Sequence, residues 1–227
     1  MRSTILLFDI DGTLVSMKGA GRRALARAFG AELGRPDVFD GFEFAGMTDP
    51  AIVRHGLGVA GAAAEPATIA RLLAAYVACL RDEVRRSTNC LVHPGVEAVL
   101  DAAAATPNVA IGLGTGNVRA GAQAKLERLG LHHRFAFGGF GCDHEERPRL
   151  LGIGAERGAA HLGTAPGACR VVVIGDTPRD VAAAEAIGAE AVAVATSAFG
   201  VDALHAAGAA AVFPDLTAPG VLEAVLG

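Results

Sequence analysis

The sequence predicts an α/β fold, in which a parallel sheet is interrupted after its first strand by an insert made only of helices. The first observation is the apolar run at residues 5–8, because four apolar residues in a row fit a strand buried on both faces. The second is residues 16–88, where helical patterns occur without a convincing strand. The third is the alternation of strand and helix patterns from residue 95 onward, which favours parallel strands joined by right-handed crossovers.

Three helices are expected in the insert. The first is indicated by apolar residues that recur at spacings of three and four: Ala20, Ala24, Leu25, Ala28 and Phe29. Gly34 then ends this helix. The second helix begins with Thr48 or Asp49 as its N-cap and has Pro50 at its first helical position. The third spans about residues 66–86.

The remainder of the chain is expected to complete the sheet. Apolar and β-branched runs predict five more strands, at residues 109–113, 135–137, 171–174, 191–194 and 211–213. Four helices are expected beside these strands. They lie at residues 95–105, in a segment that includes 125–129, in a segment that begins at Pro148, and at 182–186, where Gly188 ends the helix. We therefore predict one α/β domain from residues 1–15 and 90–227, and a helical domain from residues 16–89.

Composition and charge exclude several classes of protein. Apolar residues make up 52% of the chain, but no run of 18 apolar residues occurs, so no membrane helix is expected. The net charge is −4, and no basic stripe is present, which argues against nucleic-acid binding. The predicted first strand begins too soon after Met1 to leave room for a signal peptide, so we expect a cytoplasmic protein.

The cysteines give no indication of cross-links or of a zinc site. Four are scattered along the chain without Cys-x-x-Cys spacing: Cys79, Cys90, Cys142 and Cys169. We expect small buried thiols in a reducing compartment.

Two carboxylates follow the first predicted strand. Asp9 and Asp11 stand just before Gly12, at the end of the strand where open α/β sheets bind ligands. Two carboxylates this close repel each other, and they lose hydration if they are buried. A hard cation such as Mg²⁺ would offset both effects. The alternative is that both are turn residues, since Asp and Gly are common in turns.

Three later segments have the same form, an apolar stretch that ends in polar residues. These residues are Thr115, Gly116 and Asn117 after the strand at 109–113, Arg147 before the helix at Pro148, and Asp176 and Asp180 after the strand at 171–174. Because the carboxyl ends of parallel strands meet at one edge of a sheet, this edge is the expected binding site.

The ordered set of motifs resembles the haloacid dehalogenase-like (HAD) hydrolase superfamily of aspartate-nucleophile phosphatases. It consists of Asp-x-Asp-Gly-Thr after the first strand, a strand that ends in Thr, a basic residue, and Gly-Asp-x-x-x-Asp. The resemblance covers almost the whole chain, and it is closest to phosphoglycolate phosphatases and β-phosphoglucomutases with a helical cap. It implies a Rossmann-like parallel sheet core and makes residues 16–89 a cap domain.

The resemblance implies roles for the first motif. Asp9 would attack phosphorus and form an aspartyl-phosphate, while Asp11 would protonate the leaving group and then take a proton from the hydrolytic water. Thr13 would steady Asp11. Mg²⁺ would be held by Asp9, by the backbone carbonyl of Asp11 and by Asp176.

The later motifs would complete the site. Thr115 would bond a phosphoryl oxygen with help from the backbone N–H groups of Gly116 and Asn117. Asp180 would orient a metal-bound water or the basic residue. From the residues alone, Thr115 could instead cap the following helix, Asp180 could be a first-turn acid favoured by the helix dipole, and Asp176 could be a turn residue.

The basic position departs from the family pattern. Related phosphatases usually carry Lys before Pro, whereas this chain has Arg147 before Pro148. Arginine bridges phosphate and carboxylate groups well, so we expect Arg147 to neutralise the phosphoryl oxygens. Lys125, on the helix after Thr115, is expected to be solvated.

The leading interpretation is a Mg²⁺-dependent phosphatase that hydrolyses a small organic phosphate monoester, similar to phosphoglycolate phosphatases. Its partner would be a small phosphorylated metabolite. Alternatives are a phosphomutase of the β-phosphoglucomutase type and a non-catalytic phosphate-binding regulator. Asp11 disfavours carbon–halogen hydrolysis, and Lys18, the only lysine in the insert, leaves phosphonate hydrolysis weakly open.

The insert is expected to supply substrate specificity. Residues 46–49 and Arg22 are candidates for contacts to the leaving group of the substrate. Helix capping by Thr48 or Asp49, with a solvated Arg22, is at least as well supported by the sequence.

Overall fold

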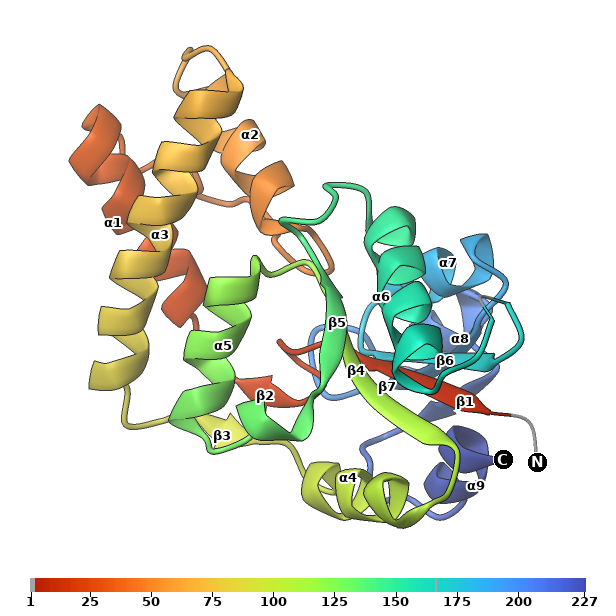
Figure 1. Cartoon of the computed structure of the whole chain (residues 1–227). Helices are drawn as coiled ribbons and strands as arrows, with labels where there is room; N and C mark the ends of the chain where they lie inside the picture. Colours follow the sequence, from red (N-terminus) through yellow and green to blue (C-terminus); the bar gives the residue numbers. More distant parts are fainter. Residues whose placement is uncertain (1–2, 166) are drawn as a thin grey trace.

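The computed structural model describes residues 3–165 and 167–227, and it confirms the predicted α/β class (Figure 1). In these residues, a six-stranded sheet has the order β5-β4-β1-β6-β7-β8, and every strand pair in it is parallel. The strands are β1 (Thr4–Phe8), β4 (Val109–Thr115), β5 (Phe137–Phe140), β6 (Arg170–Gly175), β7 (Glu190–Val194) and β8 (Ala211–Phe213). The chain runs outward from β1 to β5 and then returns to β6 on the other side of β1. Ligands bind at this kind of reversal in open α/β sheets.

Strand β1 is buried on both faces, as its apolar run predicts. Leu6 and Phe8 belong to a core shared with α4 (Val96–Ala105), α5 (Arg119–Arg128) and α9 (Val221–Leu226). Ile5 and Leu7 belong to a second core, shared with α6 (Arg147–His161), α7 (Pro178–Ala186) and α8 (Val201–Ala206). Alternate residues therefore anchor the strand between two layers of helices, which fixes the position of whatever follows Phe8.

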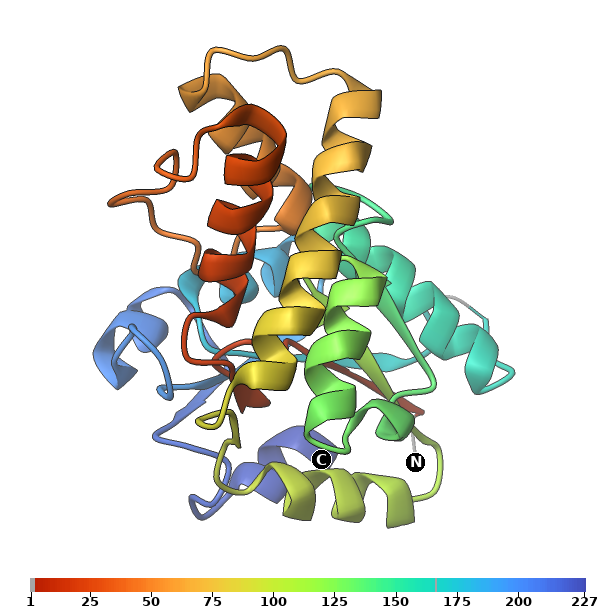
Figure 2. The same cartoon turned by 90° about the vertical axis from the view of Figure 1, so that its left-hand side faces the viewer.

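The insert is helical, as predicted, and stands to one side of the sheet (Figure 1). It comprises α1 (Ala20–Leu33), α2 (Asp49–Val59) and α3 (Pro66–Arg86), with bounds close to those expected. Helix α3 lies between α1 and the core helix α5, and Figure 2 shows the three side by side. The side chain of Thr48 caps α2, and Gly34 takes the left-handed conformation after α1.

Several elements differ from the sequence-based expectation. The chain enters and leaves the insert through a two-residue antiparallel ribbon, β2 (Val15–Ser16) with β3 (Leu91–Val92), which is too short to show a period. The strand expected at residues 135–137 is instead β5, which begins at Phe137 and contains two glycines. Helices α8 and α9 were not predicted, because six residues are too few for a helical pattern.

Two further expectations concern burial and membranes. Cys142 is exposed, so the expectation that all four thiols are buried is wrong, although Cys169 is buried. Within the described part of the chain, no helix is both long and apolar enough to cross a membrane.

Candidate active site

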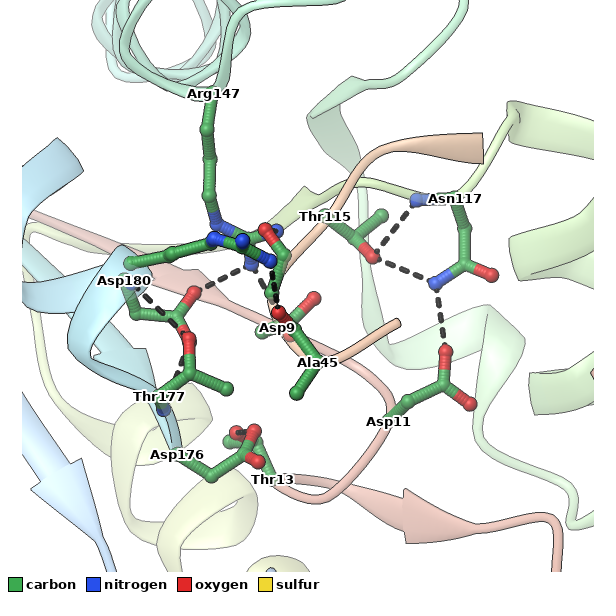
Figure 3. Close-up of polar contacts among 12 residues, drawn as sticks. Asp9, Asp11, Thr13, Ala45, Thr115, Asn117, Arg147, Asp176, Thr177 and Asp180 are labelled. Atoms are coloured by element: carbon green, nitrogen blue, oxygen red, sulfur yellow. Dashed lines mark hydrogen bonds and ion pairs between the residues drawn. The ribbon is translucent and has the colours of Figure 1, made fainter. Parts of the chain in front are cut away.

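The predicted site residues converge at the carboxyl edge of the sheet (Figure 3). Asp9 follows β1, Thr115 ends β4 and Asp176 follows β6. Arg147 begins α6, and Asp180 lies in the first turn of α7. All five are buried. The parallel sheet brings these side chains together although more than 160 residues separate the first from the last.

Arg147 binds the candidate nucleophile and a second carboxylate. Its Nη2 atom lies 3.1 Å from Asp9 Oδ2, and it also donates to Asp180 Oδ1. Asp180 is itself held in a capping box, since its Oδ2 atom accepts from the backbone N–H of Thr177 at 3.0 Å and from the Thr177 hydroxyl at 2.7 Å. Asp180 therefore anchors Arg147, and Arg147 in turn stands beside Asp9.

Asp176 is held from the first motif. The Thr13 hydroxyl donates to Asp176 Oδ1 at 2.8 Å, so the expectation that Thr13 steadies Asp11 is wrong. The turn at Gly12 makes this contact possible, because its φ of 88° is one that glycine adopts readily. A Cβ atom at Gly12 would also lie 2.3 Å from Asp176 Oδ2. The close approach of the two motifs therefore requires glycine here.

Three buried carboxylates share this part of the site. Oxygens of Asp9, Asp176 and Asp180 lie within 4.8 Å of one another. Burial raises the pKa of Asp9 to about 6, with Asp180 adding to the shift and Arg147 opposing it. Burial and the neighbouring carboxylates raise the pKa of Asp176 to about 8. Such a group of oxygen ligands with surplus negative charge fits a hard divalent cation.

Asp11 is turned away from that group, toward α5 (Figure 3). Its side chain is 46% exposed, and its Oδ2 atom lies 2.5 Å from Lys125 Nζ. The Asn117 side-chain amide donates to the same oxygen at 2.9 Å. Lys125 also donates to Asn117 Oδ1 at 2.6 Å. The expectation that Lys125 is solvated is wrong: its residue is only 4% exposed, because α3 of the insert packs against α5.

Thr115 does not cap the following helix. Its hydroxyl accepts from the backbone N–H and the side-chain amide of Asn117, at 3.3 and 2.9 Å. The N–H group of Val118, the residue just before α5, donates to Asp49 Oδ2 of the insert at 2.8 Å. Sequence reasoning did not find this role for Asp49, because only the fold brings α2 to the start of α5.

A cavity of about 440 Å³ opens between the insert and the sheet edge. The core lines it with Asp9, Asp11, Asn117, Lys125, Arg147 and Asp176, and the insert and its connections line it with Lys18, Arg22, Glu43, Tyr76 and His93. Arg22 lines the wall but is already engaged, since it donates to the carbonyls of Phe39 and Phe42 and lies over the Phe44 ring. The expectation of a solvated Arg22 is therefore also wrong.

Comparisons with known proteins agree with this arrangement. Residues 4–188 match the family model for haloacid dehalogenase-like hydrolase, and residues 154–223 match a second HAD-hydrolase-like model. A search of curated proteins gave no match.

Solved structures with the same fold span the whole chain. CbbY from Rhodobacter sphaeroides in complex with phosphate is 18% identical over 100% of both chains, with a TM-score of 0.73. A hydrolase from Pseudomonas syringae is 22% identical over 95% of this chain and 94% of its own, with a TM-score of 0.70. A predicted phosphoglycolate phosphatase from Haemophilus somnus is 16% identical over 98% and 97%, with a TM-score of 0.69. At these identities the likeness is one of fold.

Proposed function

The chain belongs to the haloacid dehalogenase-like hydrolase family, and from this premise we propose that it hydrolyses a small organic phosphate monoester with Mg²⁺ as its cofactor. The observation that carries the proposal is the position of the Asp9 carboxylate. It is buried at the end of β1, 3.1 Å from the Arg147 guanidinium, and it forms part of the cavity wall. A phosphoryl group that enters the cavity meets a cation and a nucleophile side by side.

The reaction we propose has two steps. In the first, an Asp9 oxygen bonds to phosphorus, the ester P–O bond breaks, and Asp11 gives a proton to the leaving alkoxide. In the second, water attacks the aspartyl-phosphate, Asp11 takes the proton from that water, and phosphate leaves with Asp9 restored. Arg147 and Thr115 are our candidates for binding the phosphoryl oxygens, together with the backbone N–H groups of Gly116 and Asn117.

The residues present fit a Mg²⁺ ion. We assign the ion to Asp9 and Asp176, because their carboxylates belong to the buried acidic group. The family resemblance adds the backbone carbonyl of Asp11 as a third ligand. Bound Mg²⁺ would neutralise charge on the carboxylates and on the phosphoryl group. We assign Asp180 to the support of Arg147, since both of its oxygens are already hydrogen-bonded to Arg147 and Thr177.

We further propose that the helical insert, residues 16–89, acts as a cap that limits the size of the substrate. Contacts that cross from the insert to the core support this assignment. Thr48 donates to the carbonyl of Glu145 at 2.9 Å. Arg54 forms a bidentate ion pair with the Glu145 carboxylate, from Nε to Oε1 at 3.1 Å and from Nη2 to Oε2 at 2.9 Å. A cap in this position excludes water from the cavity, which suits chemistry at a small phosphate ester.

The test is hydrolysis of 4-nitrophenyl phosphate and of a panel that includes phosphoglycolate, sugar phosphates and nucleotides. We expect phosphate release that stops in EDTA and resumes with excess Mg²⁺. Asp9→Asn should lose activity by on the order of a thousandfold or more, because the amide is not a nucleophile. Its melting temperature should not fall, since burial and the neighbouring Asp180 disfavour the charge that the change removes by more than Arg147 favours it.

A matched control is Asp202→Asn, which changes an exposed aspartate in the first turn of α8. It should keep wild-type activity. Full activity in EDTA would remove the metal from the mechanism. An active Asp9→Asn variant would remove Asp9 as the nucleophile.

A further inference from the structure

Lys125 is a buried cation that the proposed reaction does not yet use. We infer that Lys125 is a positioning residue: together with Asn117 it holds one oxygen of Asp11, so that the other oxygen is left to exchange protons with the substrate. The inference rests on the proposed phosphatase function. It adds a residue that the family motifs of the sequence do not include.

The geometry places two donors on the same atom. Lys125 Nζ lies 2.5 Å from Asp11 Oδ2, and Asn117 Nδ2 lies 2.9 Å from it. Lys125 also donates to Asn117 Oδ1 at 2.6 Å, which closes a triangle of three side chains. Within the described residues, no hydrogen bond reaches Asp11 Oδ1. One oxygen is therefore fixed, and the other is available to the cavity that Asp11 lines.

Asp11 needs such support because little else restrains it. Its side chain is 46% exposed and stands just before the turn at Gly12. An exposed carboxylate on a turn samples several rotamers, and each added rotamer reduces the time spent in the productive one. A misplacement of about 1 Å can lower the rate of a reaction about a hundredfold.

The ammonium group is enclosed from both domains. Helix α5 carries it on the core side, and the insert closes over it with Gly21 of α1 and Tyr76 of α3. A Cβ atom at Gly21 would lie 3.9 Å from Lys125 Nζ and 3.8 Å from the Tyr76 hydroxyl. Tyr76 and Lys125 both stand near Asp49, and each lowers the pKa of that carboxyl against the larger effect of burial. A buried lysine is stable only when it is paired, and here Asp11 and Asn117 are its direct partners.

The inference makes the effect of Lys125 depend on the leaving group. An alkoxide is strongly basic and must be protonated by Asp11 as the ester bond breaks. A nitrophenolate leaves without a proton, so the position of Asp11 matters less for that step. A lysine that only stabilised the fold would affect both kinds of ester equally.

The experiment compares kcat/KM for an alkyl phosphate and for 4-nitrophenyl phosphate in the full-length protein with Mg²⁺. Lys125→Met keeps an unbranched side chain about as long as the carbon stem of lysine and removes the ammonium group. We expect a loss of about a hundredfold on the alkyl ester and of less than about tenfold on the aryl ester. Inhibition by orthovanadate should be unchanged in this variant, because Asp9 and Arg147 are intact. Arg128→Met, which removes an exposed cation from the same helix, should change neither rate.

Lys125→Arg extends the test if Lys125→Met gives no cooperative unfolding transition. It restores a cation with a different shape, and its loss should be smaller but still greater on the alkyl ester. Equal losses on both esters, or no loss on either, would overturn the positioning role while the phosphatase assignment stands. A wild-type protein that hydrolyses neither ester would overturn the phosphatase assignment, and this inference with it.

Discussion

At the scale of single residues, each of the two candidate catalytic carboxylates has its own cation beside it. Arg147 stands beside Asp9, and Lys125 stands beside Asp11. The two cations are buried to a similar degree, at 7% and 4% exposure, so neither is a surface charge. Their partners differ, because Asp9 is buried whereas the Asp11 side chain is 46% exposed. Removal of either cation should mainly perturb the carboxylate beside it and have less effect on the rest of the protein.

Arg147→Ala tests the assignment of the basic position. We expect kcat to fall about a hundredfold or more, because a cation is removed from a desolvated phosphoryl site. The free energy of unfolding should also fall, by about 3–5 kcal/mol, since Asp9 and Asp180 lose their buried partner. Arg147→Lys should recover part of the activity, because the charge returns without the planar fork.

Steady-state kinetics and urea unfolding measure these effects. Arg149→Ala, two residues along the same helix and exposed, is the control and should stay within about 0.5 kcal/mol of wild type. If Arg147→Ala were as active as this control, Arg147 would have no part in binding the phosphoryl group.

At the scale of elements, the end of β4 and the start of α2 approach each other at the backbone. The N–H group of Asp49 donates to the carbonyl of Gly116 at 2.8 Å. A Cβ atom at Gly116 would lie 2.2 Å from the carbonyl oxygen of Met47. No side chain fits between these two backbones. Glycine at this position therefore lets the insert reach the edge of the sheet.

Gly116→Ala should separate the two elements. Overpacking of this kind costs about 1–3 kcal/mol in stability, and we expect kcat/KM to fall because the cavity wall moves. Gly58→Ala is the matched control, since Gly58 is an exposed position inside α2 with open space around it. That change should raise the free energy of unfolding by about 0.5–1 kcal/mol through helix propensity. Wild-type stability and activity in Gly116→Ala would show that the elements are farther apart in solution.

At the scale of the whole molecule, Asp49 joins the insert to the core through a buried carboxylate. It comes from α2, accepts from the Val118 N–H group of the core and is 6% exposed. Burial raises its pKa to about 6, although Lys125 and the Val118 N–H group oppose the shift. Protonated Asp49 therefore contributes to the free energy of unfolding. This contribution is complete below the unfolded pKa of 3.8, and it is lost as the pH rises from there through about 6. The junction between insert and core should therefore weaken toward neutral pH.

Asp49→Asn should remove this pH dependence. The amide oxygen can still accept from Val118, while no charge is buried at any pH. We expect the variant's free energy of unfolding to exceed that of wild type by an amount that grows between about pH 4 and about pH 6. Above that range the difference should stay constant at roughly 3 kcal/mol. Urea unfolding at a series of pH values measures the difference, with Asp202→Asn as the exposed control. A difference that stays constant or shrinks with rising pH would contradict the buried, ionised carboxylate.

The sequence by itself determined the fold class and the residues that reach the sheet edge. The continuous apolar run of β1 indicated burial on both faces, and the alternation of strands and helices indicated a parallel sheet. Both signals are local, because burial and crossover geometry are properties of short segments. The carboxyl ends of parallel strands always lie at the same edge of a sheet. The order of motifs along the chain is therefore enough to place Asp9, Thr115 and Asp176 at one edge.

Only the tertiary structure decided which of these side chains touch. Thr13 bonds Asp176 rather than Asp11, and Lys125 is buried against Asp11 rather than solvated. Asp49 accepts from the N–H group of Val118, just before α5, although 69 residues separate the two. These contacts depend on how the insert packs on the core, and a helix pattern does not specify which neighbour will cover its polar face. The charge of Lys125 was visible in the sequence, but its desolvation follows from α3 lying against α5.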